Sequence, residues 1–275
     1  MTANPPRESA GFPGFPPVEP VDLSHVELID LSHPWSVHTP AFAGYDGPVV
    51  KWIKRPAFDR VGGQKIETTL HVGTHLDAPI HFITGGKDIA SLPLDRLFGP
   101  GVVVDISDEV GDYDIYTPEH ITRKVEVRKG DILIIHTGYH HFYNHGDRPD
   151  EERYFCKHPG PTREFAEWAL SMELRWIGVD AGSADHPMNT VIRKLRPDLA
   201  REAERKLGRP LDEIFPDHEF QLMHNFLFPH DLVHVENVGG DIDRVLNQRV
   251  WIGCFPWKFE GGEAAFCRVV AFVKK

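Results

Sequence analysis

The chain has 275 residues, 41 % of them hydrophobic, and a formal net charge of −11. This length suits one large domain or two small ones, and the apolar fraction is sufficient for a sizeable core. The negative charge argues against nucleic acid or an anionic membrane as a partner, because both are bound through basic faces. The charge does not identify the partner that is present.

The three cysteines are Cys156, Cys254 and Cys267, and no CxxC motif occurs. Cys254 and Cys267 lie in apolar runs, which predicts buried thiols. An odd count without paired spacing favours a reducing, cytoplasmic location. No stretch is long and apolar enough to span a membrane, and the first residues do not resemble a signal peptide.

Residues 1–26 are rich in proline and glycine and predict an arm without regular structure. Short apolar runs then recur, bounded by Gly, Pro or Asp, and predict strands. They cover residues 27–30, 49–53, 66–72, 101–106, 132–136, 175–179, 250–255 and 265–273. Several are apolar throughout, as in strands buried on both faces. With no linker in sight, we expect residues 27–275 to form a single α+β domain with a mixed sheet.

Helices are expected at three places. Thr117 followed by Pro118 is typical of a helix start. Residues 162–174 carry apolar side chains at helical spacing, and residues 199–207 form a charged helix ended by Gly208. Two long polar stretches, 140–161 and 189–220, indicate functional loops, lids or subunit contacts, unless each carries short helices.

The densest cluster of chemically active side chains is the segment 71–81, which contains His71, His75, Asp77 and His81. Imidazole and carboxylate are the usual ligands of borderline divalent ions such as zinc. A hydrophobic core gains nothing from crowding such groups together. The segment therefore predicts a metal site, and a bound ion that lowers the pKa of water to roughly 7 predicts hydrolysis.

The backbone around these residues is not helical in this interpretation. Gly73 separates the first two histidines, and Pro79 follows closely; both disfavour a helix interior. Residues 65–70 alternate and include β-branched side chains, so we expect a strand that runs into a tight loop. Histidines elsewhere, such as His136, His145 and His230, are expected to be ordinary hydrogen-bonded groups.

The pattern HxGTHxDxPxH over His71–His81 resembles the signature of the metal-dependent cyclase family, which includes bacterial kynurenine formamidase and isatin hydrolase. Further segments with the same resemblance are 28–34, 130–138 and 176–183. The resemblance implies a swivelling β/β/α fold, a homo-oligomer (a dimer or tetramer) and Zn²⁺ or Mn²⁺, with one or two ions per subunit.

Carried onto this chain, the resemblance makes His71, His75 and Asp77 metal ligands and His81 the catalytic base. Asp77 would bridge to a second ion completed by His224 and Glu236. Three residues compete for the position of His224, namely Gln221, His230 and His234. The arm and the insertion at 189–220 depart from the small formamidases and leave the substrate open.

The leading hypothesis is hydrolysis of an amide C–N bond in a small molecule, including cyclic amides, imides and N-formyl aryl amines. His81 would take the proton of water and pass it to the leaving nitrogen, since histidine titrates near neutral pH. Candidate aromatic residues for the pocket are Phe42, Trp52, Phe82 and Trp257.

Three other functions compete with it. A lactone or cyclic ester hydrolase would use the same site, and a non-enzymatic metal-binding module would need only the ligands. A serine or cysteine hydrolase is disfavoured because no GxSxG motif occurs and Cys156 has no activating neighbour in sequence.

Overall fold

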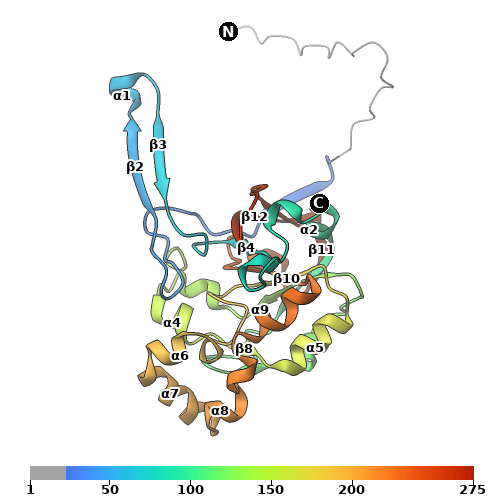
Figure 1. Cartoon of the computed structure of the whole chain (residues 1–275). Coiled ribbons are helices and arrows are strands. Elements are labelled where there is room, and N and C mark those ends of the chain that lie inside the picture. The colour runs from blue at the N-terminus through green and yellow to red at the C-terminus, as the bar shows by residue number, and fades with distance from the viewer. Residues whose placement is uncertain (1–22) are drawn as a thin grey trace.

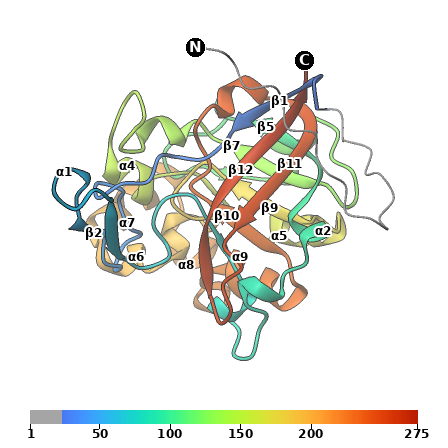
Figure 2. The ribbon, with the colours of Figure 1, turned by 90° about the horizontal axis from the view of Figure 1, so that it is seen from above.

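The computed structural model describes residues 23–275, so most of the predicted arm at 1–26 lies outside the described residues. The centre of the molecule is a sheet in the order β1-β12-β11-β5-β7-β9-β10-β4. Because β4 pairs with both β10 and β12, the sheet closes on itself as a barrel (Figures 1 and 2). The strands are β1 Val26–Asp30, β4 His75–Asp77, β5 Phe98–Asp105, β7 Ile132–His136, β9 Trp176–Val179, β10 Val233–Glu236, β11 Gln248–Pro256 and β12 Ala264–Lys274.

The sheet is mixed, as the sequence predicted. The consecutive neighbours β5, β7, β9 and β10 run parallel, whereas β1, β4 and β11 pair antiparallel with β12. Parallel neighbours present their carboxyl ends at one edge, and the next residues along the chain leave the sheet there. That edge carries the polar side chains described below.

The central strands are buried on both faces, which explains their uninterrupted apolar sequences. In β5, Val103 belongs to one core cluster while Val102 and Val104 belong to another. The same alternation separates Ile134 from Leu133 in β7. Alternate side chains of a strand point to opposite faces, so one cluster fills the barrel and the other packs beneath the outer helices.

The α-helices are short and lie outside the sheet (Figure 1). They are α1 Pro56–Asp59, α2 Leu94–Leu97, α3 Pro118–Thr122, α4 Glu151–Cys156, α5 Arg163–Ser171, α6 Ile192–Leu195, α7 Pro197–Leu207, α8 Leu211–Ile214 and α9 Leu222–Leu227. α5 and α9 contribute Phe165, Ala169 and Met223 to the outer core. Side chains of α4, α6, α7 and α8 form a third core cluster at one end of the molecule.

The helices predicted at 117, 162 and 199 are confirmed. Thr117 and Thr162 are the N-cap residues of α3 and α5, and Gly208 ends α7 with a left-handed backbone at φ 68°. The long polar stretches carry α4 and α6–α8, so the interpretation with short helices is correct.

One predicted strand is wrong in its extent. The expected strand at 66–72 ends early, because β3 (Gly63–Glu67) stops before the histidine segment. β3 pairs with β2 (Val49–Lys54) in a separate hairpin, and Thr68–Thr74 is loop. The alternation at 65–70 therefore belongs to a hairpin. Of the expected ligands, His71 lies in the loop, whereas His75 and Asp77 lie on a different strand, β4, which was not predicted separately.

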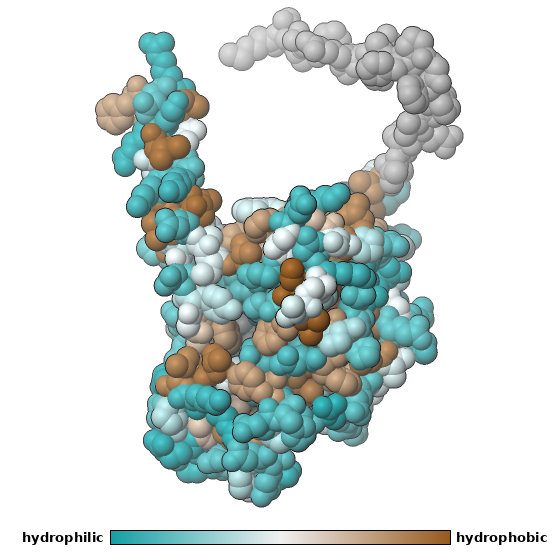
Figure 3. All heavy atoms as spheres, viewed as in Figure 1, coloured by the Kyte–Doolittle hydropathy of each residue, from teal (hydrophilic) through white to brown (hydrophobic). Residues whose placement is uncertain are grey.

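The β2–β3 hairpin projects from the body of the molecule (Figure 1), and Figure 3 shows apolar residues along it. Ile53 and Phe58 are 66 % and 84 % exposed, and Trp52 is 51 % exposed. Trp52 therefore does not line an enclosed pocket within this subunit.

The three cysteines are free and buried, as expected for Cys254 and Cys267. Among the residues that the structure describes, none of the helices combines the length and the apolar character needed to cross a bilayer.

A core substitution tests the barrel. Replacing the fully buried Leu133 of β7 by alanine should lower the free energy of unfolding by about 2–5 kcal/mol. The matched control is Leu94→Ala in α2, where the side chain is 77 % exposed, and its effect should stay within about 0.5 kcal/mol. Urea unfolding curves of both variants give the comparison; equal losses would contradict the described core.

Candidate metal centre

The site is built around β4, the three-residue strand that closes the barrel. His75 and Asp77 are two apart on β4 and so share one of its faces. In the pairing of β4 with β10, His75 lies opposite Glu236. Gly73 takes a left-handed conformation at φ 73°, and an added Cβ there would approach Trp35 at 3.1 Å. This tight loop brings His71 back against the strand, as the sequence predicted.

Three side chains of this segment converge. His71 Nδ1 and His75 Nε2 are 3.2 Å apart, and each lies 3.3 Å from Asp77 Oδ1. A tetrahedral ion with bonds of about 2.0–2.1 Å holds its ligand atoms roughly 3.3–3.4 Å apart. The three donor atoms therefore have the spacing of one face of a coordination sphere.

The other oxygen of Asp77 faces a second group of donors. Asp77 Oδ2 lies 3.6 Å from His224 Nε2 and 3.4 Å from His234 Nε2. Glu236 Oε1 is 3.7 Å from the first of these nitrogens and 3.8 Å from the second, and Glu236 Oε2 is 3.7 Å from His75. Asp77 and Glu236 thus each lie close to both groups of donors, the one that contains His75 and the one formed by His224 and His234.

These contacts test which predicted residues the fold brings together. His224 lies on α9 and Glu236 at the end of β10, and both join Asp77 as expected. His234, considered only as a competitor of His224, stands beside it with Nε2 atoms 3.1 Å apart. Gln221 lines the neighbouring pocket, whereas His230 is exposed at the end of η6 (Phe228–His230).

The buried carboxylate of Asp77 is the strongest sign of a cation. Its side chain is fully buried, and neither oxygen has a hydrogen-bond partner among the described residues. An ionised carboxylate without a partner is costly to bury unless it is paired or coordinates a metal. The imidazole nitrogens that face it are the other ligands that such an ion requires, so the donor set fits a divalent metal.

Hydrogen bonds on the far side of the rings orient the donors. His75 Nδ1 donates to the Gly73 carbonyl at 2.8 Å, and His224 Nδ1 donates to Asp185 at 2.6 Å. Glu236 Oε1 accepts the backbone N–H of Ala184 at 2.8 Å. Partners of this kind hold a metal-binding imidazole in one tautomer and one orientation.

His81 lies beside this group of donors. It ends η1 (Pro79–His81), and its ring stacks on that of His71 with 4.2 Å between centroids. Glu263 accepts from His81 Nδ1 at 3.1 Å and from His71 Nε2 at 2.7 Å. Glu263 was not among the residues predicted from the sequence, because it lies 192 residues from His71 in the chain and belongs to no motif.

The charged groups of the site shift one another's pKa values. Burial lowers the pKa of His71, but Asp77 and Glu263 outweigh it and raise this pKa to about 10. Burial likewise lowers the pKa of His224, yet Asp185 and Asp77 raise it to about 10. Burial opposes ionisation of Asp77, whereas His75 and His71 hold its pKa well below the usual value. Without metal, protons on the imidazoles compensate the buried carboxylate.

A cavity of about 370 Å³ opens on the site. Its polar wall includes His71, His81, His224 and Glu236, and its aromatic wall is made of Phe42, Tyr45 and Phe82. Two of the four aromatic residues predicted to line the pocket, Phe42 and Phe82, are therefore in place.

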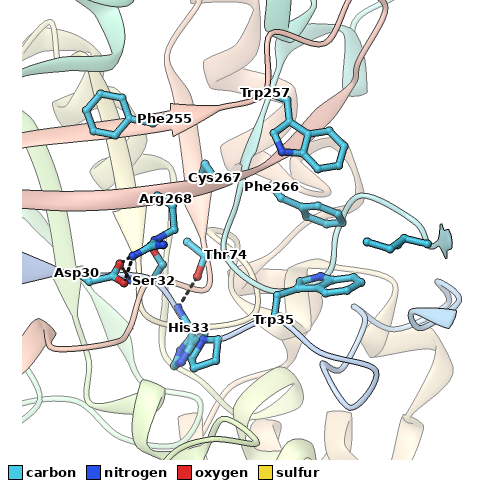
Figure 4. A pocket seen from close by; sticks show the side chains of 12 residues that line it. Asp30, Ser32, His33, Trp35, Thr74, Phe255, Trp257, Phe266, Cys267 and Arg268 are labelled. Atoms are coloured by element: carbon cyan, nitrogen blue, oxygen red, sulfur yellow. Dashed lines mark hydrogen bonds and ion pairs between the residues drawn. The ribbon is translucent and has the colours of Figure 1, made fainter. Parts of the chain in front are cut away.

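Trp257 lines a different cavity, of about 580 Å³, whose lining also includes Thr74. Figure 4 shows its ring near Trp35 and Phe266, together with the hydrogen bond from the His33 backbone N–H to Thr74. The metal-ligand candidates His71, His75 and Asp77 are absent from its lining.

A cysteine nucleophile is disfavoured by the structure. Cys156 is buried in α4, and burial raises the pKa of its thiol to about 11, where it is protonated at neutral pH.

The closed mixed sheet and its buried His and carboxylate cluster define a mixed α/β protein with a site for a divalent metal. The chain belongs to the cyclase family, since the family model described as "Putative cyclase" matches residues 29–186. This confirms the resemblance that the HxGTHxDxPxH pattern indicated.

Two curated relatives and two solved structures illustrate the likeness. The kynurenine formamidase of Bordetella avium is 29 % identical over 192 residues, covering 69 % of this chain and 85 % of the relative. That of Bacillus cereus is 34 % identical over 164 residues, covering 58 % of this chain and 70 % of the relative.

Isatin hydrolase A from Labrenzia aggregata superposes with a TM-score of 0.72 at 19 % identity, over 92 % of this chain and 95 % of that chain. A structure described as a potential metal-dependent hydrolase with cyclase activity gives 0.63 at 21 % identity, over 91 % and 99 %. The structural matches confirm the predicted mixed fold.

Metal uptake should release protons. Ligation requires neutral imidazole, and the raised pKa values of His71 and His224 keep both rings protonated at neutral pH in the metal-free protein. The affinity for Zn²⁺ should therefore rise as the pH increases from about 6 towards 9. Calorimetric titration in buffers of different ionisation enthalpy measures the released protons. A pH-independent affinity with no proton release would contradict the assigned donors.

Proposed function

We propose that this chain is a metal-dependent hydrolase that cleaves the amide C–N bond of a small molecule. The observation that carries the proposal is the buried Asp77, whose two oxygens face two groups of donors at the wall of a partly aromatic cavity. The kynurenine formamidase relatives support hydrolysis of a C–N bond other than a peptide bond.

His71, His75 and Asp77 would hold one ion. Asp77, His224, His234 and Glu236 would hold a second, which adds His234 to the ligands expected from the sequence. The nitrogen and oxygen donors suit Zn²⁺ or Mn²⁺, and one or two ions per subunit are compatible with them. Bound there, a divalent ion would polarise a substrate carbonyl and acidify water.

His81 is the general base in this proposal. It borders the cavity beside the donor cluster without facing Asp77, so metal binding leaves its ring free to move a proton. His81 would accept a proton from the attacking water and return it to the departing nitrogen. The Glu263 carboxylate fixes the ring through Nδ1 and stabilises the imidazolium that forms, as a carboxylate does behind the histidine of a catalytic triad.

Glu263 is well suited to that task. Burial alone would raise its pKa, but its hydrogen bonds with His71 and His81 lower it to about 2, so the carboxylate stays ionised. A neutral group at this position would leave the protonated ring without its partner. Glu263 is therefore a positioning residue in the proposal.

The cavity favours a small, flat substrate. Its volume of about 370 Å³ lies at the small end of ligand pockets, and the Phe42, Tyr45 and Phe82 rings would stack on a planar group. We therefore favour N-formyl aryl amines and aromatic cyclic amides or imides. The homo-oligomer and the cytoplasmic location stay predictions.

The His81→Ala variant tests the base. It should lower kcat by roughly 10²–10⁴-fold while leaving the metal content unchanged. The matched control is His218→Ala, because His218 is 78 % exposed and outside the site. Full turnover by His81→Ala would remove His81 from the mechanism.

The Asp77→Ala variant tests the metal site. It removes the carboxylate that faces both donor groups, so both the metal content and the activity should fall. Elemental analysis and circular dichroism together separate metal loss from unfolding. A folded variant that retains all its metal would refute the bridging position of Asp77.

A panel of substrates tests whether the protein cleaves an amide C–N bond or an ester bond. The metal-loaded protein should hydrolyse N-formyl anilines or aromatic cyclic amides and imides with a higher kcat/KM than lactones of matched ring size. Chelation followed by return of Zn²⁺ or Mn²⁺ is the control for metal dependence. If the protein prefers the lactones, it is a cyclic ester hydrolase and the amide assignment is wrong.

A further inference from the structure

A second cluster of potential ligands lies apart from the Asp77 cluster and shares none of its residues. It consists of His136, His140, His141 and Asp243, which together place one donor atom each within 4.8 Å of all the others. We propose that these four residues form a separate, structural binding site for a transition-metal ion such as Zn²⁺. The site is independent of the proposed hydrolase chemistry.

The donor atoms converge on the Asp243 carboxylate. His136 Nε2 is 3.4 Å from Asp243 Oδ1, while His140 Nε2 and His141 Nε2 are 3.5 Å and 3.9 Å from Asp243 Oδ2. These distances exceed the usual 2.7–3.2 Å of an N–H···O hydrogen bond. The distances from His136 and His140 are close to the roughly 3.3–3.4 Å that separates the ligands of a tetrahedral zinc ion, and that from His141 is longer.

The opposite nitrogen of each ring already has a carboxylate partner. His136 Nδ1 contacts Asp105 at 2.8 Å, His140 Nδ1 contacts Asp180 at 3.3 Å, and His141 Nδ1 contacts Asp147 at 2.9 Å. In each histidine, Nδ1 thus contacts a carboxylate outside the cluster, and Nε2 is the atom that faces Asp243 and the centre of the cluster. The carboxylate–histidine–metal arrangement is the usual outer support of a zinc site.

One of these nitrogens is an independent sign of a missing ligand. His136 Nε2 is buried and has no hydrogen-bond partner among the described residues, although His136 is only 3 % exposed. A buried polar atom without a partner is costly. An ion bound at the centre of the cluster would satisfy it.

The fold holds the histidines in place before any ion binds. His136 ends β7, Gly138 turns the chain at φ 80°, and His140 and His141 follow on η3 (Tyr139–Phe142). Asp180, just after β9, accepts hydrogen bonds from the Thr137 and Gly138 backbone N–H groups, each at 2.8 Å. A site whose ligands are positioned by a sheet edge loses little entropy on binding.

The donor set indicates the kind of ion and its role. Three imidazoles and one carboxylate suit Zn²⁺ and neighbouring transition ions, whereas Mg²⁺ and Ca²⁺ prefer oxygen ligands. Four protein ligands would close the coordination sphere, which is typical of a structural site. Asp243 belongs to η7 (Ile242–Val245), so the ion would tie the β10–β11 connection to the end of β7.

The experiment counts bound Zn²⁺ in the full chain, with no activity measurement. The test protein carries Asp243→Ala and His141→Ala; both residues are accessible, with side chains 51 % and 27 % exposed, so the buried histidines are left intact. The matched control carries Asp241→Ala and His145→Ala, which removes the same residue types nearby in the chain. Each protein is dialysed against the same buffered free Zn²⁺ and analysed for metal per subunit.

The test protein should hold one ion per subunit fewer than the wild type, and the control should hold the same number as the wild type. The same pair of double variants in an Asp77→Ala background should again differ by one ion, which assigns the lost ion to this cluster. Equal metal counts in test and control proteins that are both folded by circular dichroism would overturn the proposal. Failure of the hydrolase assignment would leave these counts unaffected.

Discussion

The structure depends on how the buried carboxylate of Asp77, on the outer face of β4, is compensated. The side chain is fully buried and has no hydrogen-bond partner within residues 23–275, so its charge must be balanced by cations. Imidazoles face both oxygens of the carboxylate, and the raised pKa values of His71 and His224 show that their protonated forms are favoured beside it. A divalent ion would replace several protons at once. The same electrostatic constraint therefore governs the ionisation of the site and its metal binding.

The strand that carries this carboxylate also closes the sheet. β4 pairs with β10 on one side and with β12 on the other, and its hydrogen bonds set the direction of His75 and Asp77. A short strand held on both sides cannot shift its register without losing both ladders, because a one-residue shift turns every side chain to the opposite face. The geometry of the donors is thus maintained by barrel closure, and the position of Glu236 follows from its pairing opposite His75.

Polar side chains collect where the parallel strands end, and both clusters of histidines use this edge. Asp105 and His136 end β5 and β7, Asp180 follows β9, and Glu236 ends β10. The apolar parts of these strands are buried on both faces, so their carboxyl ends are where side chains of other kinds can gather. One edge of the sheet thereby carries both the proposed catalytic site and the proposed structural metal site.

The sequence by itself determined the elements and the chemistry that depend on neighbouring residues. Apolar runs gave seven of the barrel and hairpin strands, Thr117 and Gly208 marked helix ends, and the spacing of His71, His75 and Asp77 indicated a metal site. These properties follow from local backbone preferences and from side chains that lie a few residues apart in the sequence. The boundary between β3 and β4 was missed because a three-residue strand has too few positions to show a period.

Only the tertiary structure decided which distant residues complete the sites. Glu263 reaches His71 and His81 because the start of β12 pairs with β4, and His234 joins Asp77 because β10 lies on the other side of that strand. His136, which looked like an ordinary histidine in sequence, meets Asp243 from the β10–β11 connection. Pairing between strands far apart in the chain sets these contacts, and neither composition nor local periodicity records that pairing.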